Sequence, residues 1–423
     1  MSRHVLVLGA GVVGLCTAWD LVQRGFRVTV LDREGPERQS ASHGNSGMIV
    51  PSHFVPLAAP GMVALGLKWM WNPESPFWVR PRLDPDLWRW AALFWQAART
   101  DRVAQAAPLL CALHLASKAC FEDLAVRLDD VFALQKRGLL MLCATEHGLA
   151  EERRTAEMAH RLGLPAEILS QAETAALDPG LPPRIAGAVY FPEDAFLVPG
   201  RFLAALERAV EEGGARLLWN TEIRGFAVRG RRIAAVQTSA GDLEADEVVL
   251  CSGVWSGALA HRLGLALPLQ AGKGYSLTVE GLPRRPGIAA ILTEARVAVT
   301  PMGDAVRFGG TMELGGRPGE IHPARVRGIL KGVLRYYPDL EPDLPARVAA
   351  GVPVWSGQRP CSPDGLPYVG RTARFDNLVV AAGHAMLGMS LGPITGRLVA
   401  QVLAGEPPAF PLGLLSPDRY AAL

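Results

Sequence analysis

The stretch Val5-Leu-Val-Leu-Gly-Ala-Gly-Val-Val-Gly14 decides the fold of this chain. Its leading apolar residues predict a strand that is buried on both faces. Gly9 allows a tight turn, Gly11 lets the backbone approach a pyrophosphate, and Gly14 lets the next helix pack closely on the strand. The N-terminus of that helix offers free N–H groups and a partial positive charge to phosphates. The stretch therefore predicts the first half of a dinucleotide-binding β-α-β unit.

A second predicted strand, Arg27-Val-Thr-Val-Leu31, ends at Asp32. An acidic side chain about 20 residues after the glycines is placed to hold the ribose hydroxyls of a dinucleotide. A glycine-rich turn alone is weak evidence, because other α/β proteins carry one. The order of strand, helix, strand and acid favours an ADP-binding unit over such a turn.

The composition excludes several classes of protein. The chain has 423 residues and is 49% hydrophobic, enough for the core of a two-domain enzyme. Its net charge is +2 without a basic cluster, so no nucleic-acid partner is expected. Six scattered cysteines predict neither a disulfide framework nor a zinc site, and no metal is expected.

No signal peptide precedes the first strand, so we expect a cytoplasmic protein. The uncharged stretches 45–67 and 377–396 are broken by proline or glycine, so no transmembrane helix is expected.

Nucleotide-binding pieces recur along the chain. A second buried strand, Glu247-Val-Val-Leu-Cys-Ser-Gly253, enters a turn of small residues, and Leu378-Val-Val-Ala-Ala382 precedes a helix near 392–404. Helices are also predicted at 200–212 and near 322–336. The fold class is therefore predicted as α/β, or an α+β composite. A Rossmann-like FAD-binding domain (1–54, 186–265 and 352–423) is interleaved with a substrate domain of mixed sheet and helices (55–185 and 266–351). A nicotinamide-only dehydrogenase usually keeps its dinucleotide domain contiguous, so the interleaving favours FAD over NAD.

Six further motifs make the prediction more specific. They are Ser42-His-Gly-Asn-Ser-Gly47, Pro56-Leu-Ala-Ala-Pro-Gly61, Leu67-Lys-Trp-Met-Trp71, Gly272-Lys-Gly-Tyr-Ser-Leu277, Gly357-Gln-Arg-Pro-Cys-Ser-Pro-Asp-Gly365 and Gly383-His-Ala-Met-Leu-Gly388. With the N-terminal glycines, they make the chain resemble FAD-dependent D-amino-acid dehydrogenases of the small catalytic subunit type. This family lies within the glycine oxidase and D-amino-acid oxidase superfamily. The resemblance covers nearly the whole chain.

The resemblance implies a noncovalent FAD held by segments far apart in the sequence. The segment 42–48 lines the flavin and its phosphates, although it also suits an ordinary capped loop. The helix that begins near Gly388 points its N-terminus at the flavin N1–C2=O edge. Met48 departs from the family, which commonly has Gln there. The implied cofactor-binding residues are Gly9, Gly11, Val12, Val13, Gly14, Asp32, Arg33, Ser42, Asn45, Ser46, Gly47, Met48, Ile223, Ser252, Gly253, Arg359, Gly388, Met389 and Ser390.

Three residues are implied in catalysis. Arg359 lies in the G-x-R-P motif and is expected to hold the substrate carboxylate through two parallel charge-assisted hydrogen bonds. The alternative is a structural pair between Arg359 and Asp364. Tyr275 is expected to bind the carboxylate or cover the site, or else to pack in the core. His384 is expected near the flavin, or else to be a hydrogen-bonded turn histidine.

The activity implied by the resemblance is the oxidative deamination of D-amino acids to 2-oxo acids and ammonia. A hydride passes from the α-carbon to flavin N5, and a quinone or a dye takes the electrons. One alternative is an oxidase or dehydrogenase of glycine, sarcosine or proline-like secondary amines. A second is a noncatalytic FAD subunit that relays electrons, and a third is an NAD-dependent enzyme. The sequence carries no signal for an oligomeric state.

An aromatic segment follows the first nucleotide-binding unit. Six of the ten tryptophans lie within residues 69–95, at Trp69, Trp71, Trp78, Trp88, Trp90 and Trp95. Amphipathic rings suit a membrane interface, where a quinone-reducing enzyme must meet its acceptor. One interpretation is therefore peripheral contact with the inner face of the cell membrane. The other is that the rings pack the helices of the substrate domain.

Overall fold

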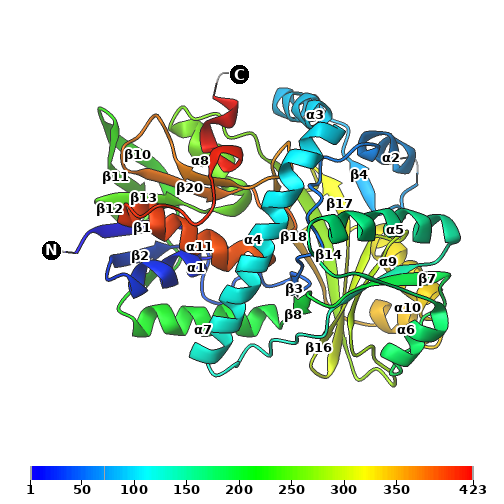
Figure 1. The fold of residues 1–423 in the computed structure, drawn as a ribbon. Helices are drawn as coiled ribbons and strands as arrows, with labels where there is room; N and C mark the ends of the chain where they lie inside the picture. Colours follow the sequence, from blue (N-terminus) through cyan, green and yellow to red (C-terminus); the bar gives the residue numbers. More distant parts are fainter. Residues whose placement is uncertain (1, 71, 422–423) are drawn as a thin grey trace.

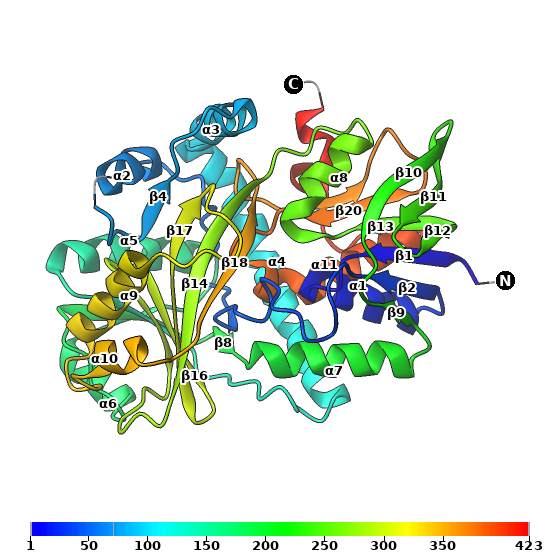
Figure 2. The same ribbon diagram turned by 180° about the vertical axis from the view of Figure 1, so that it is seen from behind.

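The computed structural model describes residues 2–70 and 72–421. Two large sheets stand side by side and are bridged by long helices (Figures 1 and 2). The strands of the first sheet come from three distant parts of the chain. In spatial order they are β19 (Tyr368–Arg371), β20 (Leu378–Ala382), β13 (Glu247–Leu250), β1 (His4–Leu8), β2 (Arg27–Leu31) and β9 (Arg216–Leu218). All neighbours are parallel except β19 and β20.

The first sheet is covered on both faces, which explains its apolar strands. In β1, Val5 and Val7 join one hydrophobic cluster, whereas Leu6 and Leu8 join another on the opposite face. Alternate residues of a strand point to opposite faces, so a strand covered twice must be apolar throughout. The first cluster is completed by α1 (Val12–Gln23), α4 (Thr100–Arg127), α7 (Pro199–Glu212) and α11 (Gly388–Ala404). The second is completed by α8 (Ser256–Arg262) and the sheet β10 (Ile223–Arg229), β11 (Arg232–Thr238) and β12 (Gly241–Leu243).

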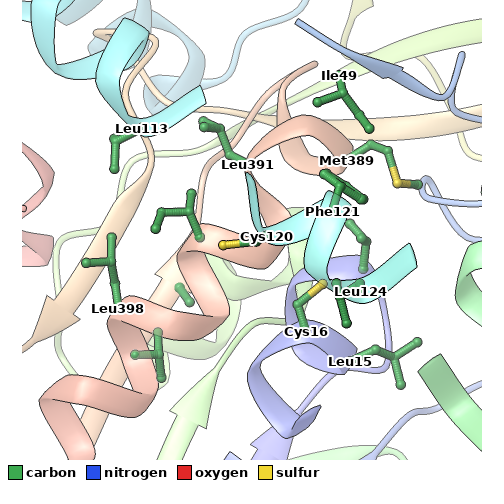
Figure 3. Close-up of a cluster of buried hydrophobic side chains, with 14 of the residues drawn as sticks. Leu15, Cys16, Ile49, Leu113, Cys120, Phe121, Leu124, Met389, Leu391 and Leu398 are labelled. Carbon is green, nitrogen blue, oxygen red and sulfur yellow. The ribbon is translucent and has the colours of Figure 1, made fainter. Parts of the chain in front are cut away.

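Helix α11 lies at the centre of the first cluster and packs against α1 and α4. Figure 3 shows Leu15 and Cys16 of α1 facing Cys120 and Phe121 of α4, with Leu391 of α11 nearby. All six cysteines are buried and free. Burial strongly raises the pKa of the Cys16 thiol, so this cysteine packs as a small apolar side chain.

The second sheet is mixed and larger. Its strands, in spatial order, are β18 (Val354–Cys361), β14 (Gln270–Glu280), β17 (Ala305–Leu314), β16 (Val297–Met302), β15 (Ala289–Leu292), β5 (Leu139–Cys143), β7 (Gly187–Phe191) and β6 (Glu167–Leu169), with β4 (Phe77–Val79) paired to β17. Helices α9 (Pro323–Tyr336) and α10 (Leu344–Ala349) close its hydrophobic cluster. The other helices of this part are α2 (Met62–Trp69), α3 (Pro85–Ala97), α5 (Glu146–Arg161) and α6 (Gln171–Leu177). Helices α2 and α3 project at the top of Figure 1.

Short elements complete the chain. The strands β3 (Met48–Ile49) and β8 (Ala195–Phe196) pair with each other between the two large sheets. Three short 3-10 turns are η1 (Gly253–Trp255), η2 (Gly413–Leu415) and η3 (Pro417–Tyr420). The two strands of the first unit and the helices α7 and α9 confirm the predictions for these segments. The helix predicted near 392–404 begins earlier, at Gly388.

The close approach of α1 and α11 gives a stability prediction. A Cβ on Gly396 would lie 2.5 Å from the backbone carbon of Cys16. We expect Gly396→Ala to lower the free energy of unfolding by about 1–3 kcal/mol, because the two helices must move apart. Urea unfolding measures the change. Gly200→Ala is the matched control, because nothing lies within 4 Å of its Cβ position in α7 and alanine favours a helix. Equal stability of the Gly396→Ala protein and the wild type would contradict this packing.

Candidate functional site

A cavity of about 1730 Å³ runs between the two large sheets. On one side it is lined by residues that follow the carboxyl ends of parallel strands, including Gly9 after β1, Asp32 after β2 and Cys251 after β13. On the other side it is lined by Thr311 of β17 and Arg359 of β18. Ligands of open α/β sheets bind at the carboxyl ends of the strands. The cavity is thus placed to hold a nucleotide on one wall and a second ligand on the other.

The turn from β1 to α1 accepts only glycine at two positions. Gly9 has φ +117°, and a Cβ there would lie 2.6 Å from the carbonyl oxygen of Cys251. A Cβ on Gly14 would lie 1.8 Å from the carbonyl oxygen of Gly9. Gly11, Val12 and Val13 line the cavity at the N-terminus of α1, whereas Gly14 does not line it. The turn therefore brings bare backbone to the cavity wall, as a pyrophosphate requires.

The residues expected around the adenosine also line the cavity. The Asp32 carboxylate accepts hydrogen bonds from the backbone N–H of Ala10 at 2.9 Å and of Glu34 at 3.0 Å, which fix its orientation. The Arg33 guanidinium lies 3.8 Å from the centre of the Trp255 ring. Ile223, Ser252 and Gly253 are the other predicted residues on this wall.

The loop 42–48 is fixed to both sheets. The Ser42 hydroxyl accepts the Val12 N–H at the start of α1 at 3.0 Å, and Ser42 also lines the cavity. From the second sheet, Arg307 donates to the carbonyl oxygens of His43 at 2.9 Å and Asn45 at 2.7 Å. Burial lowers the pKa of Arg307 to about 10. Arg307 thus holds the loop against β17.

The residues of this loop differ in whether they line the cavity. Asn45, Ser46 and Met48 line the cavity, whereas Gly47 turns away at φ +72° and its carbonyl accepts the Leu197 N–H at 2.8 Å. The Asn45 side chain accepts the Gly47 N–H at 2.8 Å, which stabilises the turn. Trp355 of β18 covers Gly44, where a Cβ would lie 2.0 Å from the indole.

The N-terminus of α11 reaches the cavity through Gly388 and Met389. No side chain caps this helix, so its first N–H groups are available to a negatively charged ligand atom. Ser390 is buried and does not line the cavity. Its hydroxyl accepts the Val50 N–H at 2.9 Å and bonds to His114 Nδ1 at 2.8 Å, so it joins α11 to β3 and α4.

Arg359 presents a cation to the cavity without a carboxylate partner. Its guanidinium lies over Gly274, where a Cβ would approach it to 2.1 Å, and it donates to the Thr311 carbonyl oxygen at 2.6 Å. Within the described residues no carboxylate lies within 4.0 Å of it. Asp364 instead accepts from Arg419 at 2.7 and 2.9 Å, so the alternative pairing of Arg359 with Asp364 is wrong. Burial lowers the pKa of Arg359, because the charged guanidinium loses contact with water. A carboxylate supplied by a ligand would compensate this charge.

Thr311 has a strained backbone beside this arginine. Its φ is +67°, which is rare for a β-branched residue, and strain of this kind clusters at functional sites. The register between β14 and β17 shifts at this point. The shift turns the Thr311 carbonyl toward Arg359. No sequence signal marked Thr311, Arg307 or Trp355, because their roles arise from strand register.

Tyr275 and His384 are less available to a ligand than Arg359. The Tyr275 side chain lies in the cluster under α9, and its hydroxyl donates to Glu313 at 2.8 Å. Tyr275 also lines the cavity, so it takes part in both the core and the cavity wall. His384 lines the cavity, but Nε2 bonds to Thr395 Oγ1 at 3.0 Å. Burial lowers the pKa of His384 to about 3, so the ring is neutral.

The aromatic segment divides between the two interpretations. Trp90 is buried, and its indole donates to the Cys361 carbonyl oxygen at 2.9 Å, so it packs the fold. Trp88 and Trp95 on α3 are 63% and 68% exposed. Trp69 and Trp78 are half-buried, and Trp71 lies outside the described residues. In the part of the chain that the structure describes, no helix combines the length and apolar character needed to cross a bilayer.

The cavity fits a dinucleotide cofactor with a redox ring. The glycine turn, the fixed Asp32 and the uncapped α11 lie along one continuous wall. Over residues 2–70 and 72–421, no three His, Cys, Asp or Glu side chains gather in a way that could hold a metal ion. The chain therefore offers a nucleotide site and an organic-anion site.

Known proteins match this chain over its whole length. The family model described as FAD dependent oxidoreductase matches residues 4–402. A D-amino acid dehydrogenase of Granulibacter bethesdensis is 33% identical over 423 residues, covering 99% of this chain and 100% of that protein. A D-amino acid dehydrogenase of Bradyrhizobium diazoefficiens is 32% identical, with 99% of each chain covered.

Solved structures show the same fold. Glycine oxidase from Geobacillus kaustophilus superposes with a TM-score of 0.79 at 24% identity, covering 99% of this chain and 100% of that chain. L-proline dehydrogenase from P. horikoshii superposes with a TM-score of 0.71 at 18% identity, covering 100% and 98%. The predicted fold class, a Rossmann-like unit combined with a mixed sheet, is thereby confirmed. With its glycine turn, its cavity between two sheets and its full-length relatives, the chain belongs to the FAD-dependent oxidoreductase family, among proteins similar to D-amino acid dehydrogenases.

Proposed function

We propose that this protein oxidises D-amino acids to 2-oxo acids and ammonia and passes the electrons to a quinone or a dye. The observation that carries the proposal is Arg359, a half-buried cation on the cavity wall that has no carboxylate partner among the described residues. An α-amino acid supplies the missing carboxylate. The full-length relatives named as D-amino acid dehydrogenases support this substrate class over the glycine, sarcosine and proline alternatives. Because the chain belongs to an FAD-dependent family, FAD is favoured over NAD as the cofactor.

The protein contributes orientation and electrostatics to this reaction. Bound FAD supplies the acceptor for the hydride of the substrate α-carbon. Arg359 holds the substrate carboxylate and so fixes the direction of the α C–H bond. The N–H groups at Gly388 and Met389 offer a partial positive charge to negative charge developing near the cofactor. The mostly apolar walls around Arg359 strengthen the bond between guanidinium and carboxylate by excluding water.

An anaerobic mixing experiment tests the proposal. Holoprotein is mixed with D-alanine, L-alanine, glycine, sarcosine and both proline enantiomers, and the visible band of the oxidised flavin is followed. Bleaching by D-alanine but not by L-alanine is the expected result. Bleaching by none of them would support the electron-relay alternative. Bleaching only by glycine, sarcosine or proline would show that the substrate belongs to that class and is not a D-amino acid such as D-alanine. Release of all flavin on acid precipitation is expected for the noncovalent FAD.

Replacing Arg359 tests the carboxylate contact. Arg359→Ala removes one partner of a charge-assisted pair, which costs about 2–5 kcal/mol. We therefore expect kcat/KM for D-alanine to fall at least about 30-fold, while the bound FAD content is unchanged. Arg208→Ala on α7 is the control, because that side chain is 63% exposed. Unchanged kcat and KM in the Arg359→Ala protein would show that the substrate carboxylate is bound by a residue other than Arg359.

We further propose that α3 contacts the inner face of the cell membrane, from the cytoplasm, to reach the acceptor. Trp88 and Trp95 lie seven positions apart and therefore on one face of the helix. Leu67 and Leu83 extend the exposed apolar surface at 61% and 97% exposure. Exposed Lys68 and Arg89 suit anionic lipid head groups.

Vesicle binding tests this contact. The double variant Trp88→Ser with Trp95→Ser should bind anionic lipid vesicles at least about tenfold more weakly than the wild type, because two apolar rings no longer enter the interface. Co-sedimentation at low and moderate salt measures the binding. Val126→Ser with Val228→Ser is the control, because both valines are exposed on other elements. Failure of the wild-type protein to bind vesicles at both salt concentrations would contradict the proposed contact between α3 and the membrane.

A further inference from the structure

A chain of polar residues leads from the interior to the cavity beside β3 and β8. Asp194 is fully buried and accepts two hydrogen bonds from Ser52, one from its N–H at 3.0 Å and one from its hydroxyl at 2.5 Å. The Ser52 hydroxyl also lies 3.0 Å from Nδ1 of His53. Ser52 and His53 both line the cavity. No step of the proposed reaction described above uses these three residues.

The direction of this chain fixes the tautomer of His53. A serine hydroxyl carries one hydrogen, and an ionised Asp194 can only accept it. The Ser52 oxygen must then accept from His53, so the proton of the neutral imidazole is on Nδ1. Nε2 is left with a free lone pair, and within the described residues no protein group bonds to it. Burial lowers the pKa of His53 to about 4, so the ring is neutral at neutral pH.

His53 lines the same cavity as Arg359. Besides burial, the Arg296 guanidinium lowers the pKa of His53, and both residues line the cavity. Arg296 directly precedes β16, where Val297 pairs with Gly310, and its carbonyl oxygen would lie 3.4 Å from a Cβ on Gly310. The next residue, Thr311, accepts the hydrogen bond from Arg359. His53, Arg296, Thr311 and Arg359 thus line one cavity, and Arg296 connects the His53 side of it to the strands that carry Thr311.

We propose that His53 contacts the substrate and accepts a hydrogen bond from its amino group through Nε2, with Ser52 and Asp194 setting the tautomer that makes this contact possible. The proposal rests on the proposed function, because it assigns a residue to the amino group of the same substrate. A carboxylate held by Arg359 leaves the amino group of an α-amino acid two bonds away. An acceptor-only nitrogen suits a neutral amine, which donates N–H and keeps its lone pair for the oxidation.

The protonation state of the Asp194 carboxyl group makes the contact between His53 and the substrate depend on pH. Burial raises the pKa of Asp194 to about 7, against the opposing effects of the Ser52 hydrogen bonds and Lys118. Below that pH the protonated Asp194 donates to Ser52, Ser52 donates to His53 Nδ1, and Nε2 carries the proton instead. Besides Arg296 and Asp194, the charged or titratable groups that act on this chain are Cys111, His114, Lys118, Tyr190 and Glu193.

Asp194→Asn tests the tautomer directly. The amide introduced by this substitution donates to the Ser52 oxygen at every pH and so imposes the state that the wild type adopts only at low pH. We expect kcat/KM for D-alanine to be at least about tenfold below wild type above pH 7. The ratio of the two values should approach one well below pH 7. Titration of the substrate amine affects both proteins equally and cancels in the ratio.

Two further measurements separate this role from a structural one. His53→Leu should lower kcat/KM at least about tenfold above pH 7 while FAD content is unchanged. His261→Gln, on the exposed surface of α8, is the matched control. Nitrogen NMR of histidine-labelled holoprotein, with the His53 signal assigned by its loss in His53→Leu, should show a protonated Nδ1 and a bare Nε2 above pH 7.

The proposal is overturned by a protonated Nε2 in that spectrum, by wild-type kcat/KM in His53→Leu, or by a pH-independent ratio for Asp194→Asn. Failure of the proposed function gives a different result. In that case the wild type itself is not reduced by any D-amino acid, whereas the tautomer of His53 is still measured by NMR.

Discussion

The site depends on one interaction, the hydrogen bond from the Arg359 guanidinium to the carbonyl oxygen of Thr311. A buried cation is costly unless a negative group compensates it. Here a carbonyl dipole holds the guanidinium in place but leaves its charge unbalanced, and Gly274 leaves room for it to lie flat on the sheet. The protein thus keeps a strained Thr311 and an unpaired cation at the place where a carboxylate ligand would relieve the cost.

The two large sheets are joined through the loop that lines the cofactor side of the cavity. Ser42 ties that loop to α1, whereas Arg307 of β17 ties it to the second sheet. A ligand that binds this loop therefore stabilises the junction of the sheets as well as itself. Because Arg359 and Thr311 belong to the second sheet, the substrate site is oriented by the same junction. Arg307 thus links the loop on the cofactor side of the cavity to the sheet that carries Arg359.

The sequence predicted the parts of this structure that depend on local chemistry. Gly9 and Gly14 are required by contacts within one β-α-β unit, and the alternating burial of β1 follows from its apolar run. Thr311 escaped prediction because its role depends on a register shift between strands that are distant in sequence. Tyr275 was expected either to contact the substrate carboxylate or to pack in the core; it lines the cavity, joins the cluster under α9 and donates its hydroxyl to Glu313, a contact that no sequence signal marked. The domain boundaries and the roles of the individual site residues stay predictions.

The polar groups of the cavity differ in what they can offer a ligand. His384 is neutral and its Nε2 is occupied by Thr395, and Ser390 is occupied by Val50 and His114. His53 is also neutral, and Ser52 holds its Nδ1 while Nε2 has no hydrogen-bond partner among the described residues. A neutral acceptor beside an unpaired arginine complements the two ends of an α-amino acid whose amine has lost its proton. His53 would accept an N–H of that amine while Arg359 holds the carboxylate, so the two proposed contacts would orient the α C–H bond from both ends of the substrate.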